Sequence, residues 1–183
     1  MVQLTRAFAL LAVVSVGLAA SVKRANGATI IADFKLISDG VGALNKASGD
    51  FSADPKNPTK AISIHTAAVT LQKQLQTTAG DAQNTAAISE ADGKTIVGAV
   101  CAIADAVADT INNLIKNKDN FNNLPVHGVL ALVCTDIKNN ESSEQSVSDN
   151  LLPKCPKDLV AQATGCLNKI QAALNNGIAA YCP

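Results

Sequence analysis

The sequence predicts an all-α protein, an antiparallel bundle of about five amphipathic helices. Three observations indicate this fold class. Apolar residues recur every three or four positions through most of the chain, which is the period of a helix and not of a strand. The composition is 48% hydrophobic but only 3% aromatic, with no Trp, whereas sheets are enriched in aromatic and β-branched residues. Short loops rich in Gly, Pro, Asn and Asp separate the apolar segments.

The first 24 residues are predicted to be absent from the mature protein. Residues 1–20 combine a short apolar run with small residues at its end, as in a secretory signal peptide. Residues 21–24 would form a short pro-segment that ends in the dibasic pair Lys23-Arg24; the alternative is a chance basic pair in an exposed tail. The mature domain then covers residues 25–183, a common size for one domain.

The first two helices are expected on either side of a loop rich in helix breakers. The first should span about residues 29–47, although Gly40 and Gly42 weaken it by ~1 kcal/mol each relative to Ala. The second should begin at Pro58, with Asn57 as its N-cap, and reach about residue 78. The two apolar stripes are Phe34, Ile37, Val41 and Leu44, then Ile64, Ala68, Leu71 and Leu75.

A long third helix should begin at the capping pattern Ser89-Glu90-Ala91-Asp92 and end near residue 118. Its segment 95–115, TIVGAVCAIADAVADTINNLI, carries charge only at Asp105 and Asp109. An ionised Asp near the centre of a membrane span costs roughly 2.5–3.5 kcal/mol. We therefore expect a helix with a wide apolar face that other elements cover, and no transmembrane segment in the mature chain.

The fourth helix should follow a polar turn at residues 119–124 and have Pro125 in its first turn. Its apolar spacing, continued along the chain, reaches the polar residues Asn140 and Glu144. This interruption predicts a kink or break at the NNESSE segment. The fifth helix should span about residues 157–181.

No pattern in the chain indicates catalysis, a metal site or a cofactor. The sequence has no G-x-S-x-G elbow, no phosphate-binding glycine loop and no HExxH motif. His65 and His127 read as ordinary helix residues, and Asp105 and Asp109 as a solvated helix face and not as a catalytic carboxylate pair. Removal of the first 24 residues lowers the basic residues from 15 to 12 against 15 acidic ones, a net charge of about −3, so no nucleic-acid partner is expected.

Five cysteines in the second half of the chain are disulfide candidates in a secreted protein. Their odd number leaves at least one free or paired between molecules. Cys101 and Cys166 would lie at matching heights on parallel helices, which favours their pairing over a bond from Cys101 to Cys134. The five cysteines are Cys101, Cys134, Cys155, Cys166 and Cys182.

The segment Asn140-Glu141-Ser142 is an N-glycosylation sequon, whereas Asn57-Pro58-Thr59 is blocked by its proline. Its place in the polar interruption of the fourth helix predicts that Asn140 is exposed and glycosylated; the alternative is an unoccupied sequon.

Four stretches, in this order, resemble the fungal hydrophobic-surface-binding protein A family, also called cell-wall galactomannoproteins. The resemblance covers about residues 30–181 and implies a secreted, non-enzymatic helical bundle. It further implies adsorption to hydrophobic surfaces, recruitment of secreted hydrolases, association with cell walls, and a fatty acid held between the helices. The stretches are AISIHTAAVTLQKQL, ISEADGKTIVGAV, LPVHGVLALVCTDI and CPKDLVAQATGCLNKIQAALNNGIAAY.

The expected function is binding of a hydrophobic surface or a fatty-acid-like lipid by the apolar helix faces. Alternatives are a plain structural core, a module that recruits or inhibits a secreted hydrolase, and an effector recognised by a host. The protein is expected outside the cell, freely secreted or in the wall, because no Ser/Thr-rich stalk or apolar tail follows Tyr181. The residues predicted to contact an apolar ligand are Val41, Leu71, Leu75, Val100, Ile103, Val107, Val133 and Ile170.

Overall fold

The computed structural model describes residues 25–182, which form a helical bundle with no strand in that range. The expected all-α fold is confirmed. The predicted signal peptide and pro-segment lie outside the described residues. Two short helical segments, α4 (Lys118–Asn122) and the 3-10 turn η1 (Leu152–Lys154), connect the last three long helices. The long helices are α1 (Gly27–Ala53), α2 (Pro58–Asn84), α3 (Glu90–Lys116), α5 (Val129–Leu151) and α6 (Val160–Tyr181).

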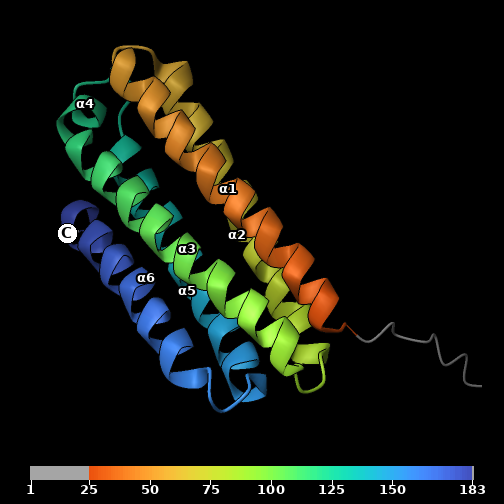
Figure 1. Cartoon of the computed structure of the whole chain (residues 1–183). Coiled ribbons are helices and arrows are strands. Elements are labelled where there is room, and N and C mark those ends of the chain that lie inside the picture. Colours follow the sequence, from red (N-terminus) through yellow and green to blue (C-terminus); the bar gives the residue numbers. More distant parts are fainter. Residues whose placement is uncertain (1–24, 183) are drawn as a thin grey trace, which may run out of the picture.

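The five long helices form a closed ring, in which each packs against two others (Figure 1). The order around the ring is α1, α2, α5, α6 and α3. Long helices that follow one another in the chain run antiparallel, so α2 and α5 run in the same direction, as do α3 and α6. The apolar faces of all five therefore point towards one common axis.

Helix α3 occupies the ring between α1 and α6. By length and composition it could cross a membrane, with a mean hydropathy of 1.4 over its most apolar window. Its apolar face packs into the bundle, and Asp105 and Asp109 are exposed on the other side, as expected for a solvated face.

The helix starts agree with the capping residues in the sequence. The Asn57 side chain accepts a hydrogen bond from the backbone N–H of Thr59, with Pro58 in the first turn. The Ser89 hydroxyl accepts from the N–H of Asp92 at 3.1 Å and donates to the Asp92 carboxylate at 2.8 Å. Both residues satisfy N–H groups that the first turn of a helix leaves without a partner.

Helices α1 and α2 are longer than predicted. Helix α1 continues past residue 47 because Phe51, which is 0% exposed, extends the apolar stripe by nearly two turns. Helix α2 continues past residue 78 because the small side chains of Ala79 and Ala82 are buried against the neighbouring helices. The shorter ranges were based on the helix-breaking residues in these segments. Burial of the apolar side chains stabilises the helices by more than those residues destabilise them.

Helix α5 begins later than predicted, at Val129 and not at Pro125. The residue before it, Gly128, has φ 86°, a left-handed conformation that glycine adopts without steric cost and that cannot continue a right-handed helix. Residues 123–128 therefore form a turn, and His127 lies exposed in this turn, not in a helix as expected.

The predicted break at NNESSE is wrong, because α5 is continuous through it. The polar side chains on its inner face bond to the helix itself. The Asn140 amide donates to the Asp136 carbonyl at 2.9 Å, and the Ser143 hydroxyl donates to the Asn139 carbonyl at 2.8 Å. Because the donors of both side chains are paired, the two residues can be buried without ending the helix.

The predicted exposure of Asn140 is also wrong, since this residue is only 7% exposed. Its amide nitrogen also donates to the Ala68 carbonyl of α2 at 3.2 Å. A glycan attached to this nitrogen would have to displace α2. The folded bundle therefore does not support the glycosylation hypothesis for Asn140.

An aromatic cluster closes one end of the bundle, and it includes a helix that the sequence did not predict. Residues 119–124 were expected to be a turn, but Phe121 anchors α4 with its ring stacked on Phe51 at 4.4 Å between centroids. Tyr181 meets Phe121 edge-on at 6.2 Å, and its hydroxyl donates to the Leu114 carbonyl. The cluster joins the ends of α1, α3, α4 and α6.

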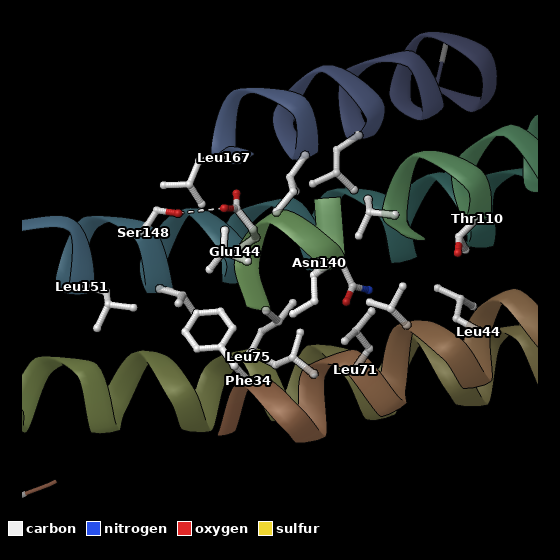
Figure 2. Close-up of a pocket in the computed structure, with 18 of the residues that line it drawn as sticks. Phe34, Leu44, Leu71, Leu75, Thr110, Asn140, Glu144, Ser148, Leu151 and Leu167 are labelled. Carbon is white, nitrogen blue, oxygen red and sulfur yellow. Dashed lines mark hydrogen bonds between the residues drawn. The ribbon is translucent and has the colours of Figure 1, made fainter. Parts of the chain in front are cut away.

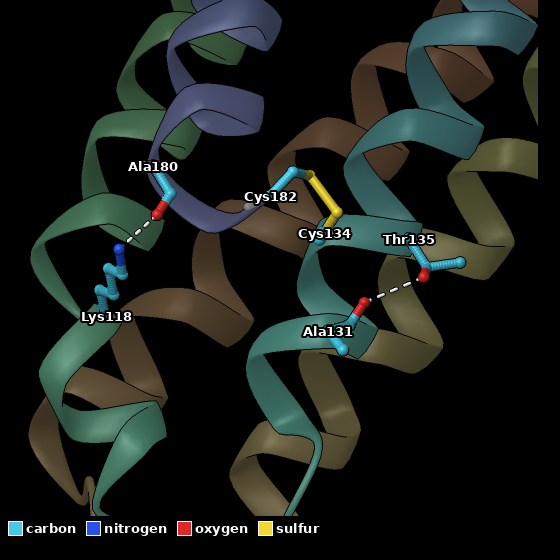
Figure 3. The surroundings of a disulfide bond; sticks show 6 residues. All are labelled: Lys118, Ala131, Cys134, Thr135, Ala180 and Cys182. Carbon is cyan, nitrogen blue, oxygen red and sulfur yellow. Dashed lines mark hydrogen bonds between the residues drawn. A yellow bond between two sulfur atoms is a disulfide. The ribbon is translucent and has the colours of Figure 1, made fainter.

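Two disulfide bonds join α6 to its two neighbours in the ring. Cys101 of α3 is bonded to Cys166 of α6, the pair that the matching helix heights favoured. Cys134 of α5 is bonded to Cys182, directly after α6 (Figure 3). Cys155 is free and half-buried. Two disulfide bonds are consistent with a secreted protein.

Asp33 on α1 is a buried carboxyl whose charge opposes folding. Burial, followed by the nearby Asp81 carboxylate of α2, raises the pKa of Asp33 to about 6 from an ordinary value of 3.8. Between these two values the folded state holds a proton that the unfolded state releases. The resulting stability is fully present below about pH 4 and is lost as the pH rises through about 6.

We expect Asp33→Asn to raise the free energy of unfolding at pH 7 by on the order of 1 kcal/mol, less than the full pKa shift implies because solvent reaches part of the carboxyl. Urea denaturation between pH 4 and 7 measures this change and should show a weaker pH dependence than in the wild type. The exposed Asp39 on the same helix serves as the control, as Asp39→Asn. If both variants changed the free energy of unfolding and its pH dependence by the same amount, the effect could not be assigned to the buried carboxyl of Asp33.

Candidate functional site

A cavity of about 120 Å³ lies along the axis of the helix ring. All five long helices contribute to its walls. Each of the eight residues that the sequence singled out for an apolar ligand lines this cavity, from Val41 on α1 to Ile170 on α6. Phe34, Ile37, Ile96, Ile111, Leu114 and Leu174 add to the same apolar wall.

The cavity follows from the number of helices and the size of their side chains. Five helices in a ring surround a wider axis than four, and close packing of that axis would need large side chains. The wall instead consists mainly of Val, Ile, Leu and Ala, and Phe34 is its only aromatic residue among the described positions. An unfilled volume of this size costs about 3 kcal/mol at about 24 cal/mol per Å³.

Five polar side chains interrupt the apolar wall, and four of them lie on α5. The Thr110 hydroxyl of α3 donates to the Ala106 carbonyl at 2.8 Å. On α5, Asp136, Asn140, Glu144 and Ser148 succeed one another at intervals of four and share the inner face. Figure 2 shows the last three of them. The sequence carried this signal, since the apolar stripe reaches Asn140 and Glu144, but it was interpreted as a break.

The two carboxyls on this face are in different surroundings. His65 of α2 lies with Nδ1 2.9 Å from Asp136 Oδ2, so the imidazole has an acidic partner that the sequence did not indicate. Burial raises the pKa of the Asp136 carboxyl, and His65 opposes that shift. Burial likewise raises the pKa of Glu144, against the effect of the Ser148 hydroxyl, which donates to it at 2.7 Å.

The residues that line the cavity include no Lys, Arg or His. Elsewhere in residues 25–182, no three His, Cys, Asp or Glu side chains are placed to hold a metal ion. The walls can therefore surround an apolar group and bond to a few polar atoms, but they offer no cation to an anionic ligand.

A surface cleft of about 580 Å³ between α5 and α6 adjoins the cavity. The cleft and the cavity share five lining residues, and Figure 2 shows Leu167 of α6 beside Glu144 and Ser148 of α5. The Cys134–Cys182 bond ties the two helices near the other end of α5. The cleft is therefore the place where a small separation of two helices would open the cavity. The shared residues are Glu144, Ser148, Leu152, Cys155 and Leu167.

A sequence profile described as hydrophobic surface binding protein A matches residues 27–152, which is more than half of the chain. The chain belongs to this family. No curated protein sequence matches significantly. The resemblance inferred from the helical stretches is thus confirmed. A ring of helices with apolar inner faces is consistent with a family named for binding hydrophobic surfaces.

Solved structures share the fold of this hydrophobic-surface-binding family member. One is Afmp4p in complex with palmitic acid, with a TM-score of 0.78 and 20% identity, over 85% of this chain and 99% of that chain. Another is ligand binding domain 1 of Penicillium marneffei MP1 protein, complexed with arachidonic acids. It has a TM-score of 0.75 and 16% identity, over 86% of this chain and 100% of that chain. At these identities the similarity establishes the fold alone.

Proposed function

We propose that the central cavity binds the acyl chain of a fatty-acid-like lipid, and that the protein does this outside the cell without catalysing a reaction. The observation that carries the proposal is the convergence of aliphatic side chains from all five long helices on one unfilled apolar space. The complexes of Afmp4p with palmitic acid and of MP1 domain 1 with arachidonic acids support it, because proteins with the same fold bind fatty acids there.

The length of the cavity wall suits an acyl chain. Along α3 the lining residues run from Gly93 to Leu114, about 30 Å at 1.5 Å per residue. The hydrocarbon core of a bilayer, in which two acyl chains meet end to end, is also about 30 Å thick. The wall is thus long enough for one chain with space to spare.

The volume requires the helices to separate when a long chain binds. A cavity of about 150 Å³ is known to hold a benzene molecule, and a sixteen-carbon chain is much larger than the 120 Å³ available. We infer that α5 and α6 separate along the cleft that adjoins the cavity. Burial of the acyl chain contributes about 0.8 kcal/mol of binding free energy per CH₂ group. Association and ordering offset several kcal/mol, so we expect a micromolar dissociation constant.

Adsorption to a hydrophobic surface would need a larger opening, and the disulfide bonds restrict where it can occur. They link α3, α5 and α6 into one unit, whereas no disulfide bond joins α1 or α2 to it. We infer that the α1–α2 hairpin swings away along its contacts with α3 and α5 and presents the inner apolar faces.

Palmitic acid should bind the delipidated protein at a 1:1 ratio by isothermal titration calorimetry. At ten times the dissociation constant it should stabilise the fold by about 1.4 kcal/mol, which raises the melting temperature by about 3–6 °C. Butyric acid, which has the same head group and a short chain, should produce no shift. Absence of binding by palmitic acid, or an equal shift with both acids, would contradict the proposal.

A further inference from the structure

Asn140 presents a buried hydrogen-bond acceptor to the cavity. In the described part of the chain, four buried side-chain oxygens have no hydrogen-bond partner, namely those of Asp33, Ser48, Gln74 and Asn140. Of these residues only Asn140 lines the cavity. A buried acceptor without a partner costs about 1–3 kcal/mol, so a ligand that supplies a donor there gains more than it would in water.

The orientation of the amide is determined by its neighbours. The nitrogen Nδ2 donates to the backbone carbonyls of Asp136 at 2.9 Å and Ala68 at 3.2 Å. Exchange of the oxygen and nitrogen positions would place Oδ1 against two carbonyl oxygens, which is repulsive. Oδ1 therefore faces away from both carbonyls, and Figure 2 shows the side chain between the α5 and α2 walls, near Leu71.

The other polar groups of the wall cannot serve an anionic head group. The hydroxyl protons of Thr110 and Ser148 are committed to the Ala106 carbonyl and the Glu144 carboxyl. The remaining side-chain donor is the weak thiol of Cys155. An ionised carboxylate placed inside would meet two carboxyls, Asp136 and Glu144, and no cation.

We propose that the cavity selects a lipid whose head group carries an O–H donor, either a hydroxyl or a protonated carboxyl, and that Asn140 Oδ1 accepts this hydrogen bond. The proposal rests on the acyl-chain function proposed above and adds the chemistry of the head group. The head group then lies part-way along the cavity, between α2 and α5, with the chain extending along the apolar wall.

The chain supplies a matched control for Asn140. Asn150, also on α5, donates its amide to the carbonyl four residues earlier, that of Ser146, at 2.9 Å, and to the Ala79 carbonyl of α2 at 3.4 Å. Both asparagines thus fasten α5 to α2 in the same way, but Asn150 does not line the cavity. Replacement of either residue by Leu removes the equivalent pair of hydrogen bonds, but only Asn140→Leu also removes an acceptor from the cavity.

The test compares the binding of hexadecan-1-ol with that of its methyl ether, 1-methoxyhexadecane, which lacks the donor. We expect the wild type and Asn150→Leu to bind the alcohol about 5- to 10-fold more tightly than the ether, and Asn140→Leu to bind the two equally. Palmitic acid distinguishes the source of the donor. If Asn140→Leu weakens the acid as much as the alcohol, a protonated carboxyl reaches the amide; if only the alcohol is weakened, hydroxyl lipids are the ligand class.

Equal binding of alcohol and ether by the wild type would overturn the proposal, even if Asn140→Leu failed to fold. Retention of the full preference for the alcohol in a folded Asn140→Leu variant would overturn it as well. Failure of the wild type to bind any of these lipids would instead contradict the acyl-chain function on which it rests.

Discussion

Val107→Phe should weaken the binding of palmitic acid at least tenfold and leave the protein folded. Val107 lies in the wall of the cavity, and the substitution adds four carbon atoms that point into a space of about 120 Å³. Overpacking of a filled core costs about 1–3 kcal/mol, and the existing cavity should keep the cost near the lower limit. Competition against a fluorescent fatty acid measures the affinity, and thermal denaturation checks the fold.

Chain length and position provide the controls for this variant. A ten-carbon acid should lose less affinity than palmitic acid, because it can occupy the part of the cavity that the new ring does not block. Ala102→Phe places the same ring on the exposed side of α3 and should bind palmitic acid as the wild type does. Undiminished palmitic acid binding by folded Val107→Phe would place the lipid elsewhere.

Removal of the Cys101–Cys166 bond should be the most destabilising of the changes considered. Its sequence separation of 65 residues corresponds to about 4 kcal/mol of loop-closure entropy in the unfolded chain. We therefore expect the Cys101→Ala, Cys166→Ala double variant to melt roughly 8–16 °C below the wild type. Differential scanning calorimetry measures the shift.

Cys155→Ala is the matched control, because this thiol is free. It should melt within a few degrees of the wild type. The double variant should also adsorb faster to a hydrophobic polymer, since it no longer links α6 to α3. A melting temperature equal to that of Cys155→Ala would mean that the bond contributes nothing to the stability of the folded protein.

The fold could be predicted because the apolar stripes are long and regular. Val41, Leu71, Val100, Val133 and Ile170 each lie on a stripe of helical period, and a bundle is the arrangement that buries all the stripes together. Periodicity alone places these residues inside, and it also brings them to the same cavity. It does not determine which helices are neighbours, so a ring of five with an unfilled axis could not be distinguished from a solid core.

The polar features of the site could not be predicted, because the period of a helix does not show which groups a polar residue on its apolar face will contact. Asn140 interrupts a stripe, and an interruption has the same appearance in the sequence whether the helix breaks or the amide nitrogen finds partners inside the bundle. Only the approach of the Ala68 carbonyl from α2 decides between the two. The short helix α4 was missed because Phe121 stands alone in a polar segment, and its partners Phe51 and Tyr181 are distant in the sequence.

The most direct test of the central claim is to locate the lipid chain on the protein. Intermolecular nuclear Overhauser effects between the methylene groups of ¹³C-labelled palmitic acid and protein methyl groups provide this measurement. We predict contacts to Leu71, Ile103 and Val133, which line the cavity. Contacts confined to the exposed side chains of Leu36, Ile62 and Leu132 would contradict the account, because the lipid would then lie on the outer surface of the bundle.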